Sequence, residues 1–144
     1  MTTQPLAQTF KIDAIGGVFL TSVNLFFATK DPTIPVWIEI RNTVAGTPGQ
    51  QVLPYSRKIL EPAFVNTDFE RGETPTSFVF ESPVYCQEGQ EYALVIVSKS
   101  QEYLIWTARV GGTDAITGGL VTSQPAIGSM YKSSNSSTWT PVQS

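Results

Sequence analysis

The sequence of 144 residues contains no histidine and only one cysteine, Cys86. Without histidine, the chain cannot build a Ser-His-Asp or Cys-His catalytic set, nor a metal site with imidazole ligands. A single cysteine cannot form an intrachain disulfide. Cys86 stands in "SPVYCQEG" at the end of an apparent strand, where we expect a small, partly buried apolar residue. We therefore predict no catalytic residues, no metal and no cofactor.

Charged residues are also scarce, at 15% of the chain against 41% apolar residues. The nine lysines and arginines are scattered, and only Arg57 and Lys58 are adjacent. Because binding nucleic-acid phosphates takes clustered basic side chains, we expect no nucleic-acid partner. Low charge together with eight Phe, five Tyr and three Trp is typical of a globular chain rather than a disordered one.

Long apolar runs are missing as well. No segment approaches the roughly 18 consecutive apolar residues of a membrane helix. The first residues, "MTTQPLAQTF", lack the basic and apolar regions of a signal peptide. We therefore expect a soluble protein with no signal peptide and no membrane insertion.

What the sequence does contain is a repeated alternation of apolar and polar residues. In "VFLTSVNLFFA" the alternation places Phe19, Val23 and Phe27 on one face of a strand. In "VWIEIR" it separates the apolar residues from a row made of Trp37, Glu39 and Arg41. The runs are separated by breakers such as "NTVAGTPGQ", "VGGTD" and "ITGG", which predict turns. This pattern predicts an all-β fold, an antiparallel, jelly-roll-like β-sandwich in one domain spanning residues 1–144.

The apolar runs predict about eight to nine strands. We expect them near residues 7–13, 18–28, 36–41, 55–60, 76–84, 91–98, 103–110, 130–133 and 138–142. Residues 61–75, "EPAFVNTDFERGETP", form the longest irregular connection in this assignment. Such a loop either crosses the end of the sandwich or faces a partner.

Acidic residues are the remaining route to catalysis. A glycosidase-type site needs two carboxyl groups facing one cleft. Here Glu39, Glu91 and Glu102 sit on or beside strands, and the aspartates sit beside turn residues. This distribution is typical of solvated acids and turn caps, so we expect the chain not to be an enzyme. The alternative is an enzyme whose catalytic groups are a pair of carboxylates.

Aromatic residues are the candidates for ligand binding. Sugar-binding sandwiches stack an exposed aromatic ring, apolar on its face and polar at its tip, against the sugar. Each candidate is alternatively a core or corner residue of the sandwich. In "MYKSSNSSTWTPVQS" we expect a closing hairpin that turns at "SSNSS". The carbohydrate-binding candidates are Trp37, Tyr103, Trp106, Tyr131 and Trp139, with Tyr55 as a further one.

The order of several segments resembles a known family. The segments are "PLAQTFKID", "GGVFLTSVNLFFATKD", "IPVWIEIRNTVAGTPGQQVLP", "FVFESPVYCQEGQEYALVIVSKSQEYLIWTA" and "GSMYKSSNSSTWTPVQS", which span the chain from about Pro5 to Gln143. In this order they resemble a β-sandwich module of the baseplate and tail-fibre proteins of contractile-tailed bacteriophages. They are also similar to bacterial jelly-roll modules built like carbohydrate-binding domains. The resemblance supplies no matched set of ligand residues.

The resemblance implies a non-enzymatic virion module that serves structure or attachment. Its expected partners are other virion proteins, host-surface glycan and, in the parent protein, further copies in a homo-oligomer. It also implies a location in the phage tail and a domain excised from a longer protein. The alternative is a carbohydrate-binding module that recognises a cell-surface polysaccharide through its exposed aromatics.

Overall fold

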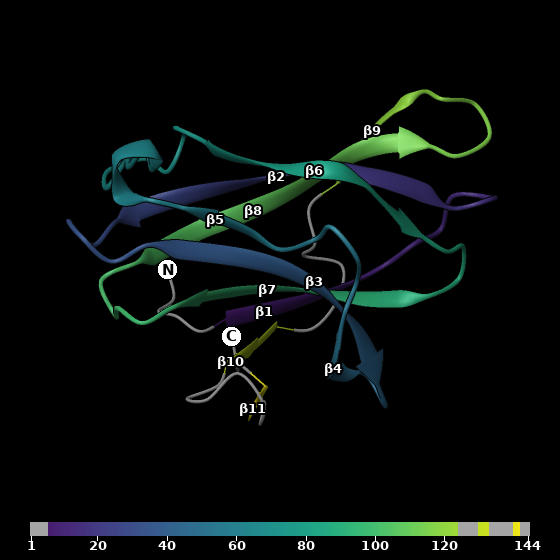
Figure 1. The fold of residues 1–144 in the computed structure, drawn as a ribbon, viewed down its shortest axis with the longest axis horizontal. Helices are drawn as coiled ribbons and strands as arrows, with labels where there is room; N and C mark the ends of the chain where they lie inside the picture. The colour runs from purple at the N-terminus through teal and green to yellow at the C-terminus, as the bar shows by residue number, and fades with distance from the viewer. Residues whose placement is uncertain (1–5, 124–129, 133–139, 142–144) are drawn as a thin grey trace.

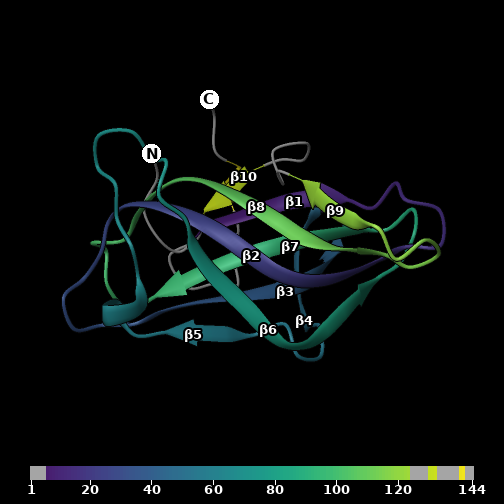
Figure 2. The same cartoon turned by 90° about the horizontal axis from the view of Figure 1, so that it is seen from above.

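The computed structural model describes residues 6–123, 130–132 and 140–141. These residues form two antiparallel β-sheets, stacked face to face (Figures 1 and 2). The predicted all-β, antiparallel sandwich is therefore confirmed.

The larger sheet contains seven strands within the described part of the chain. Its strands follow one another in the order β11, β10, β1, β7, β3 and β4, and β5 also pairs with β3. Their bounds are β1 (Leu6–Lys11), β3 (Val36–Val44), β4 (Thr47–Val52), β5 (Lys58–Leu60), β7 (Glu91–Ser98), β10 (Met130–Lys132) and β11 (Thr140–Pro141).

The smaller sheet contains four strands in the order β6, β2, β8 and β9 (Figure 2). Their bounds are β6 (Thr76–Cys86), β2 (Val18–Thr29), β8 (Leu104–Asp114) and β9 (Leu120–Ser123). The expected irregular connection, residues 61–75, holds the short 3-10 turn η1 (Pro62–Phe64) and an isolated bridge between Thr67 and Phe27. It crosses from the larger sheet to the smaller one.

The core lies between the two sheets and follows the predicted alternation on β3. Val36, Ile38 and Ile40 are fully buried on the inner face of this strand. They share one cluster with Phe27 and Phe78 of the opposite sheet. Each fully buried side chain of this size stabilises the fold by about 1.5–3 kcal/mol, so the inward rows hold the two sheets together.

Strand β2 departs from simple alternation at one point. Its pairing with β6 and β8 shifts register between Leu20 and Ser22, which marks a β-bulge. Leu20 is buried, whereas Phe19 is 38% exposed. The predicted grouping of Phe19 with Val23 is therefore wrong, because one extra residue moves the following side chains to the other face. At this bulge β8 comes so close that a Cβ on Gly112 would lie 2.2 Å from the Phe19 carbonyl oxygen.

Two stretches that we expected to be turns contain strand residues: β4 begins within "NTVAGTPGQ", and β8 runs through "VGGTD". The expected turn at "ITGG" is confirmed and leads directly into β9. Pro48 is compatible with β4 because this strand is at the edge of its sheet, where a missing N–H is tolerated. Only Ala45 and Gly46, both with positive φ, form the turn between β3 and β4.

The expected closing hairpin is present as β10 and β11. Tyr131 pairs with Pro141, and Lys132 pairs with Thr140, in antiparallel register. The expected "SSNSS" turn and Trp139 lie outside the described residues.

Candidate interaction surfaces

The predicted carbohydrate-binding aromatics whose side chains are described lie in three separate places. Trp37 lies on β3 in the larger sheet, and Trp106 lies on β8 in the smaller sheet. Tyr103 directly precedes β8 and belongs to the core. Tyr131 is on β10, where its backbone pairs with Ala7 of β1; Trp139 is outside the described residues.

Tyr103 is a core residue. Its side chain is fully buried, and its ring meets Phe27 edge-on, with ring centroids 5.7 Å apart. Its hydroxyl donates a hydrogen bond to the Ile34 carbonyl oxygen. Burial raises the pKa of Tyr103 to about 12, and the negative charges of Asp31 and Glu61 add to the rise. Because no face of this ring is open to solvent, Tyr103 is unavailable for stacking against a sugar.

Trp37 is half-buried on the outer face of the larger sheet. It pairs with Ile59 of β5 on one side and with Val97 of β7 on the other. The ring packs against a small apolar cluster that includes Val95 and Val97. The guanidinium carbon of Arg57 lies 5.0 Å from the ring centroid, a cation–π contact. Trp37 is thus already engaged by the sheet below it and by Arg57.

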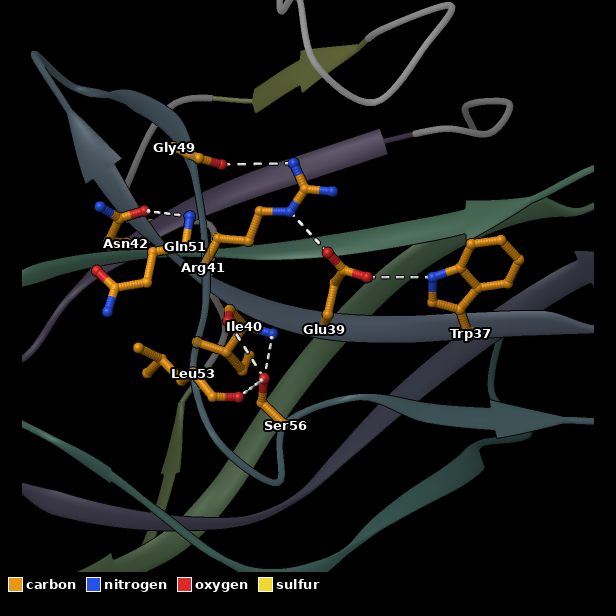
Figure 3. Close-up of polar contacts among 9 residues, drawn as sticks. All are labelled: Trp37, Glu39, Ile40, Arg41, Asn42, Gly49, Gln51, Leu53 and Ser56. Atoms are coloured by element: carbon orange, nitrogen blue, oxygen red, sulfur yellow. Dashed lines mark hydrogen bonds and ion pairs between the residues drawn. The ribbon is translucent and has the colours of Figure 1, made fainter.

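Glu39 links Trp37 to Arg41 along the outer face of β3 (Figure 3). One carboxylate oxygen accepts a hydrogen bond from Trp37 Nε1 at 3.2 Å, and the other pairs with Arg41 Nε at 2.7 Å. Arg41 Nη1 donates to the Gly49 carbonyl oxygen across the β3–β4 hairpin at 3.4 Å. The Arg41 and Glu39 side chains are only 9% and 7% exposed. The aromatic, acidic and basic groups of this row therefore face one another.

The connection between β4 and β5 is fixed to the backbone of the same strand (Figure 3). The buried Ser56 hydroxyl accepts a hydrogen bond from the Ile40 N–H at 3.0 Å and donates to the Leu53 carbonyl at 2.8 Å. Tyr55, the further aromatic candidate, precedes it with a φ of 66° and is 65% exposed. A tyrosine in this left-handed region is uncommon, and the anchored Ser56 holds the backbone there.

Trp106 fastens the loop of residues 61–75 to the smaller sheet. Its Nε1 donates a hydrogen bond to the Asp68 carbonyl oxygen at 2.9 Å. The Asp68 carboxylate accepts the N–H groups of Arg71 and Glu73, and these bonds lower the pKa of Asp68. Gly72, with a φ of 63°, lies so close that a Cβ would be 2.6 Å from the indole. Trp106 is 40% exposed, but its polar atom and one side of its ring serve the loop.

A row of four side chains, of which three are exposed and apolar and the fourth is the half-buried Thr113, crosses all four strands of the smaller sheet. Tyr85 of β6 pairs with Phe19 of β2, Phe19 with Thr113 of β8, and Thr113 with Leu120 of β9. We call these four residues the apolar row. The rings of Phe19 and Tyr85 are 5.1 Å apart, and Leu120 is 91% exposed. Sequence reasoning missed this row because the bulge in β2 places Phe19 on the outer face.

The loops at this end of the sandwich extend the apolar row. Tyr85 donates a hydrogen bond from its hydroxyl to the Gly16 carbonyl oxygen at 2.8 Å. Ile116 packs onto the same glycine, where a Cβ would be 2.7 Å from its side chain. Ile15 and Ile116 are 73% and 67% exposed. Single exposed apolar side chains are ordinary, whereas a contiguous group of them commonly marks an interaction site.

Comparisons with protein-family models, with curated proteins and with solved structures found no match to this chain. No helix in the described part of the chain is long and apolar enough to cross a membrane. Residues 6–123, 130–132 and 140–141 contain no group of three or more side chains placed to hold a metal ion. Cys86 is fully buried, where we expected a partly buried residue, and burial raises the pKa of its thiol to about 12.

Proposed function

We propose that this chain is a non-enzymatic virion module of a phage tail-fibre or baseplate protein, which contacts neighbouring virion proteins or the host surface. The observation that supports a docking role is the apolar row with its flanking isoleucines, which leaves aromatic and aliphatic side chains in water. Such a patch favours a covering partner, since burying apolar area is the main source of association free energy. The assignment to a phage tail rests on the resemblance of the five sequence segments.

Phe19 and Tyr85 are the anchors of this proposed docking surface. Their rings touch each other, and Tyr85 is also held through its hydroxyl by Gly16. Rigid aromatic residues lose little conformational entropy on binding and are frequent among the residues that dominate interface energies. The bulge and the close approach of Gly112 fix the backbone beneath them, so the surface is formed before a partner arrives.

The virion assignment is tested by mass spectrometry of gradient-purified particles of the phage that carries this gene. We expect peptides of the chain in the particles, at a fixed ratio to other tail proteins, and tail genes beside its own gene. A chain that is present in the infected-cell lysate but absent from purified particles would show that the assignment is wrong.

The docking surface is tested by incorporation of variants into particles. We expect Phe19→Lys to reduce incorporation, because it places a charge in the apolar row. Val79→Lys is the matched control, since Val79 is 56% exposed on β6 of the same sheet but outside the row. Both variants are first compared with wild type in thermal unfolding. Equal incorporation of the two folded variants would refute the role of the row.

Carbohydrate binding is the second candidate, and the Trp37 row favours it. There the half-buried indole of Trp37 lies on the outer face of the larger sheet, beside the exposed guanidinium of Arg57, and an aromatic ring next to a polar group is the combination that binds a sugar. A glycan array that includes host surface polysaccharide, probed with wild type, Trp37→Ala and Trp106→Ala, tests this. We expect binding to be lost in folded Trp37→Ala and kept in folded Trp106→Ala. A wild-type chain that binds no glycan would exclude the candidate.

A further inference from the structure

The unpaired strand edges of the two sheets differ in how they are protected. A strand edge exposes backbone N–H and C=O groups that can bind another strand, and proline, charge and shortness block such pairing. Strand β6 contains Glu81 and Pro83, and β4 contains Pro48. Strand β5 has three residues including Lys58, and β11 has two including Pro141. Among the edges that the structure describes, only β9, with the four-residue sequence LVTS, has neither proline nor charge, so its short length is the one protection it has.

The hydrogen bonds of the β8–β9 hairpin determine which backbone groups of β9 face outward. The Asp114 N–H donates to the Gly119 carbonyl oxygen at 2.9 Å, and the register continues residue by residue from that pair. Hydrogen-bonded and non-hydrogen-bonded pairs alternate along an antiparallel ladder. Val121 therefore directs its backbone groups toward β8, and Leu120 and Thr122 direct theirs toward the open edge.

Val121 and Leu120 of β9 face opposite sides of the sheet, and this arrangement leaves the edge of the strand suitable for a partner. Val121 packs against the core between the sheets, which holds the strand in place. Leu120, at the end of the apolar row, is 91% exposed, more than any other large apolar residue described. Within residues 6–123, 130–132 and 140–141 no strand pairs with this outer edge, so an outward row of backbone N–H and C=O groups lies beside the exposed Leu120.

We infer that β9 pairs antiparallel with β9 of a second copy, about a two-fold axis at Val121. In this register Leu120 of each copy lies opposite Thr122 of the other, so the outward N–H and C=O groups of both copies satisfy one another. The pairing is isologous and closed, because each copy uses the same edge. It joins the two smaller sheets into one sheet, in which Leu120 at the end of each apolar row lies beside Thr122 of the other copy. This inference goes beyond the proposed function and holds for the purified chain alone.

Pairing over one short strand gives a weak dimer. A standard stable interface buries about 1,200–2,000 Å², and an edge of this length covers less. We therefore expect a dimer that forms with increasing concentration, which a covalent trap at the axis would capture. Directly opposed residues of an antiparallel pair have Cβ atoms about 4.5–5.5 Å apart, and closer in a non-hydrogen-bonded pair such as Val121 with its copy. That separation approaches the range of a disulfide.

The experiment is disulfide trapping of Val121→Cys with oxidised glutathione, followed by non-reducing electrophoresis. The native Cys86 is fully buried, so the new thiol is the reactive one. Ile15→Cys is the control for random collision, because Ile15 is 73% exposed at the same end of the molecule but off the edge. We expect several-fold more covalent dimer from Val121→Cys. Equal or smaller yields from Val121→Cys would overturn the inference.

A second variant tests whether the edge hydrogen bonds cause the pairing. Thr122→Pro, made in the Val121→Cys chain, removes an outward N–H and leaves the bonds to β8 in place. We expect it to reduce the covalent dimer to the level of Ile15→Cys, with an unchanged circular dichroism spectrum. Undiminished trapping in a folded Thr122→Pro chain would also overturn the inference. All of these measurements use the purified chain, so they stand whether or not it is found in phage particles.

Discussion

Removal of the Tyr103 hydroxyl is the most direct test of the core. The variant Tyr103→Phe keeps the ring against Phe27 but leaves the Ile34 carbonyl oxygen without its donor. Leaving a partly buried acceptor unpaired costs about 1–3 kcal/mol. For a chain of this size each kcal/mol lowers Tm by about 2–4 °C. Urea unfolding and calorimetry of wild type and variant measure both quantities.

The companion variant Tyr103→Ala tests the packing of the ring itself. Truncation of a fully buried aromatic to alanine costs about 3–5 kcal/mol, because it removes apolar burial and leaves a cavity. We therefore expect Tyr103→Ala to be clearly less stable than Tyr103→Phe. Equal stability of the two variants would mean that the ring is not packed in the core, and a cost below about 1 kcal/mol for Tyr103→Ala would refute its burial.

Because the Tyr103 hydroxyl is buried, we expect the folded chain to lose stability at alkaline pH. Burial raises the pKa of Tyr103 to about 12, whereas an unfolded tyrosine ionises near about 10. Between these values the unfolded chain has released the proton and the folded chain still holds it, so stability falls as pH rises from about 10 to 12. Tyr103→Phe should lose this part of the slope. An alkaline unfolding curve parallel to that of wild type would refute the reasoning.

Three further predictions concern polar and close-packed positions. Backbone N–H donors are the chief cause that lowers the pKa of Asp31 to about 2. The stability that the ionised Asp31 contributes is therefore full above about pH 4 and is lost as pH falls toward 2. In Asp31→Asn we expect the urea midpoint to depend less on pH across this range than it does in wild type. Glu39→Gln leaves Arg41 charged without its carboxylate and should cost about 3–5 kcal/mol in urea unfolding; a neutral effect would mean that the pair is hydrated. Gly72→Ala places a Cβ against the Trp106 indole at a position with positive φ. We therefore expect more than about 1 kcal/mol of destabilisation and an altered tryptophan emission spectrum. Wild-type stability and emission would contradict the close contact between Gly72 and Trp106.

Much of the fold could be predicted because alternation reports burial directly. On β3 a period of two separates Val36 and Ile38 from Trp37, and the structure confirms that division. The same rule failed on β2, where the bulge after Leu20 exchanges the faces. A bulge depends on how neighbouring strands fit one another, so no pattern within β2 predicted that Phe19 would be exposed.

The candidate surfaces were predicted less well than the strands. Trp37 does lie on an outer face, but its polar neighbours face one another along the strand, and Arg57 comes from a different strand connection. Tyr103 is an aromatic residue of the kind that stacks against a sugar, yet it is fully buried in the core. Whether an aromatic residue in a strand meets solvent or another sheet depends on what lies opposite, and that partner is distant in the sequence.

The sequence by itself determined the class of this protein, because apolar residues at every second position can be buried only as strands of stacked sheets. It also determined the absence of histidine chemistry and of an intrachain disulfide. The tertiary structure decided which aromatics reach the surface, where β4 and β9 extend the sheets, and that four strands align Tyr85, Phe19, Thr113 and Leu120. Register between strands is set by contacts across long sequence separations, and those contacts exist only in the folded chain.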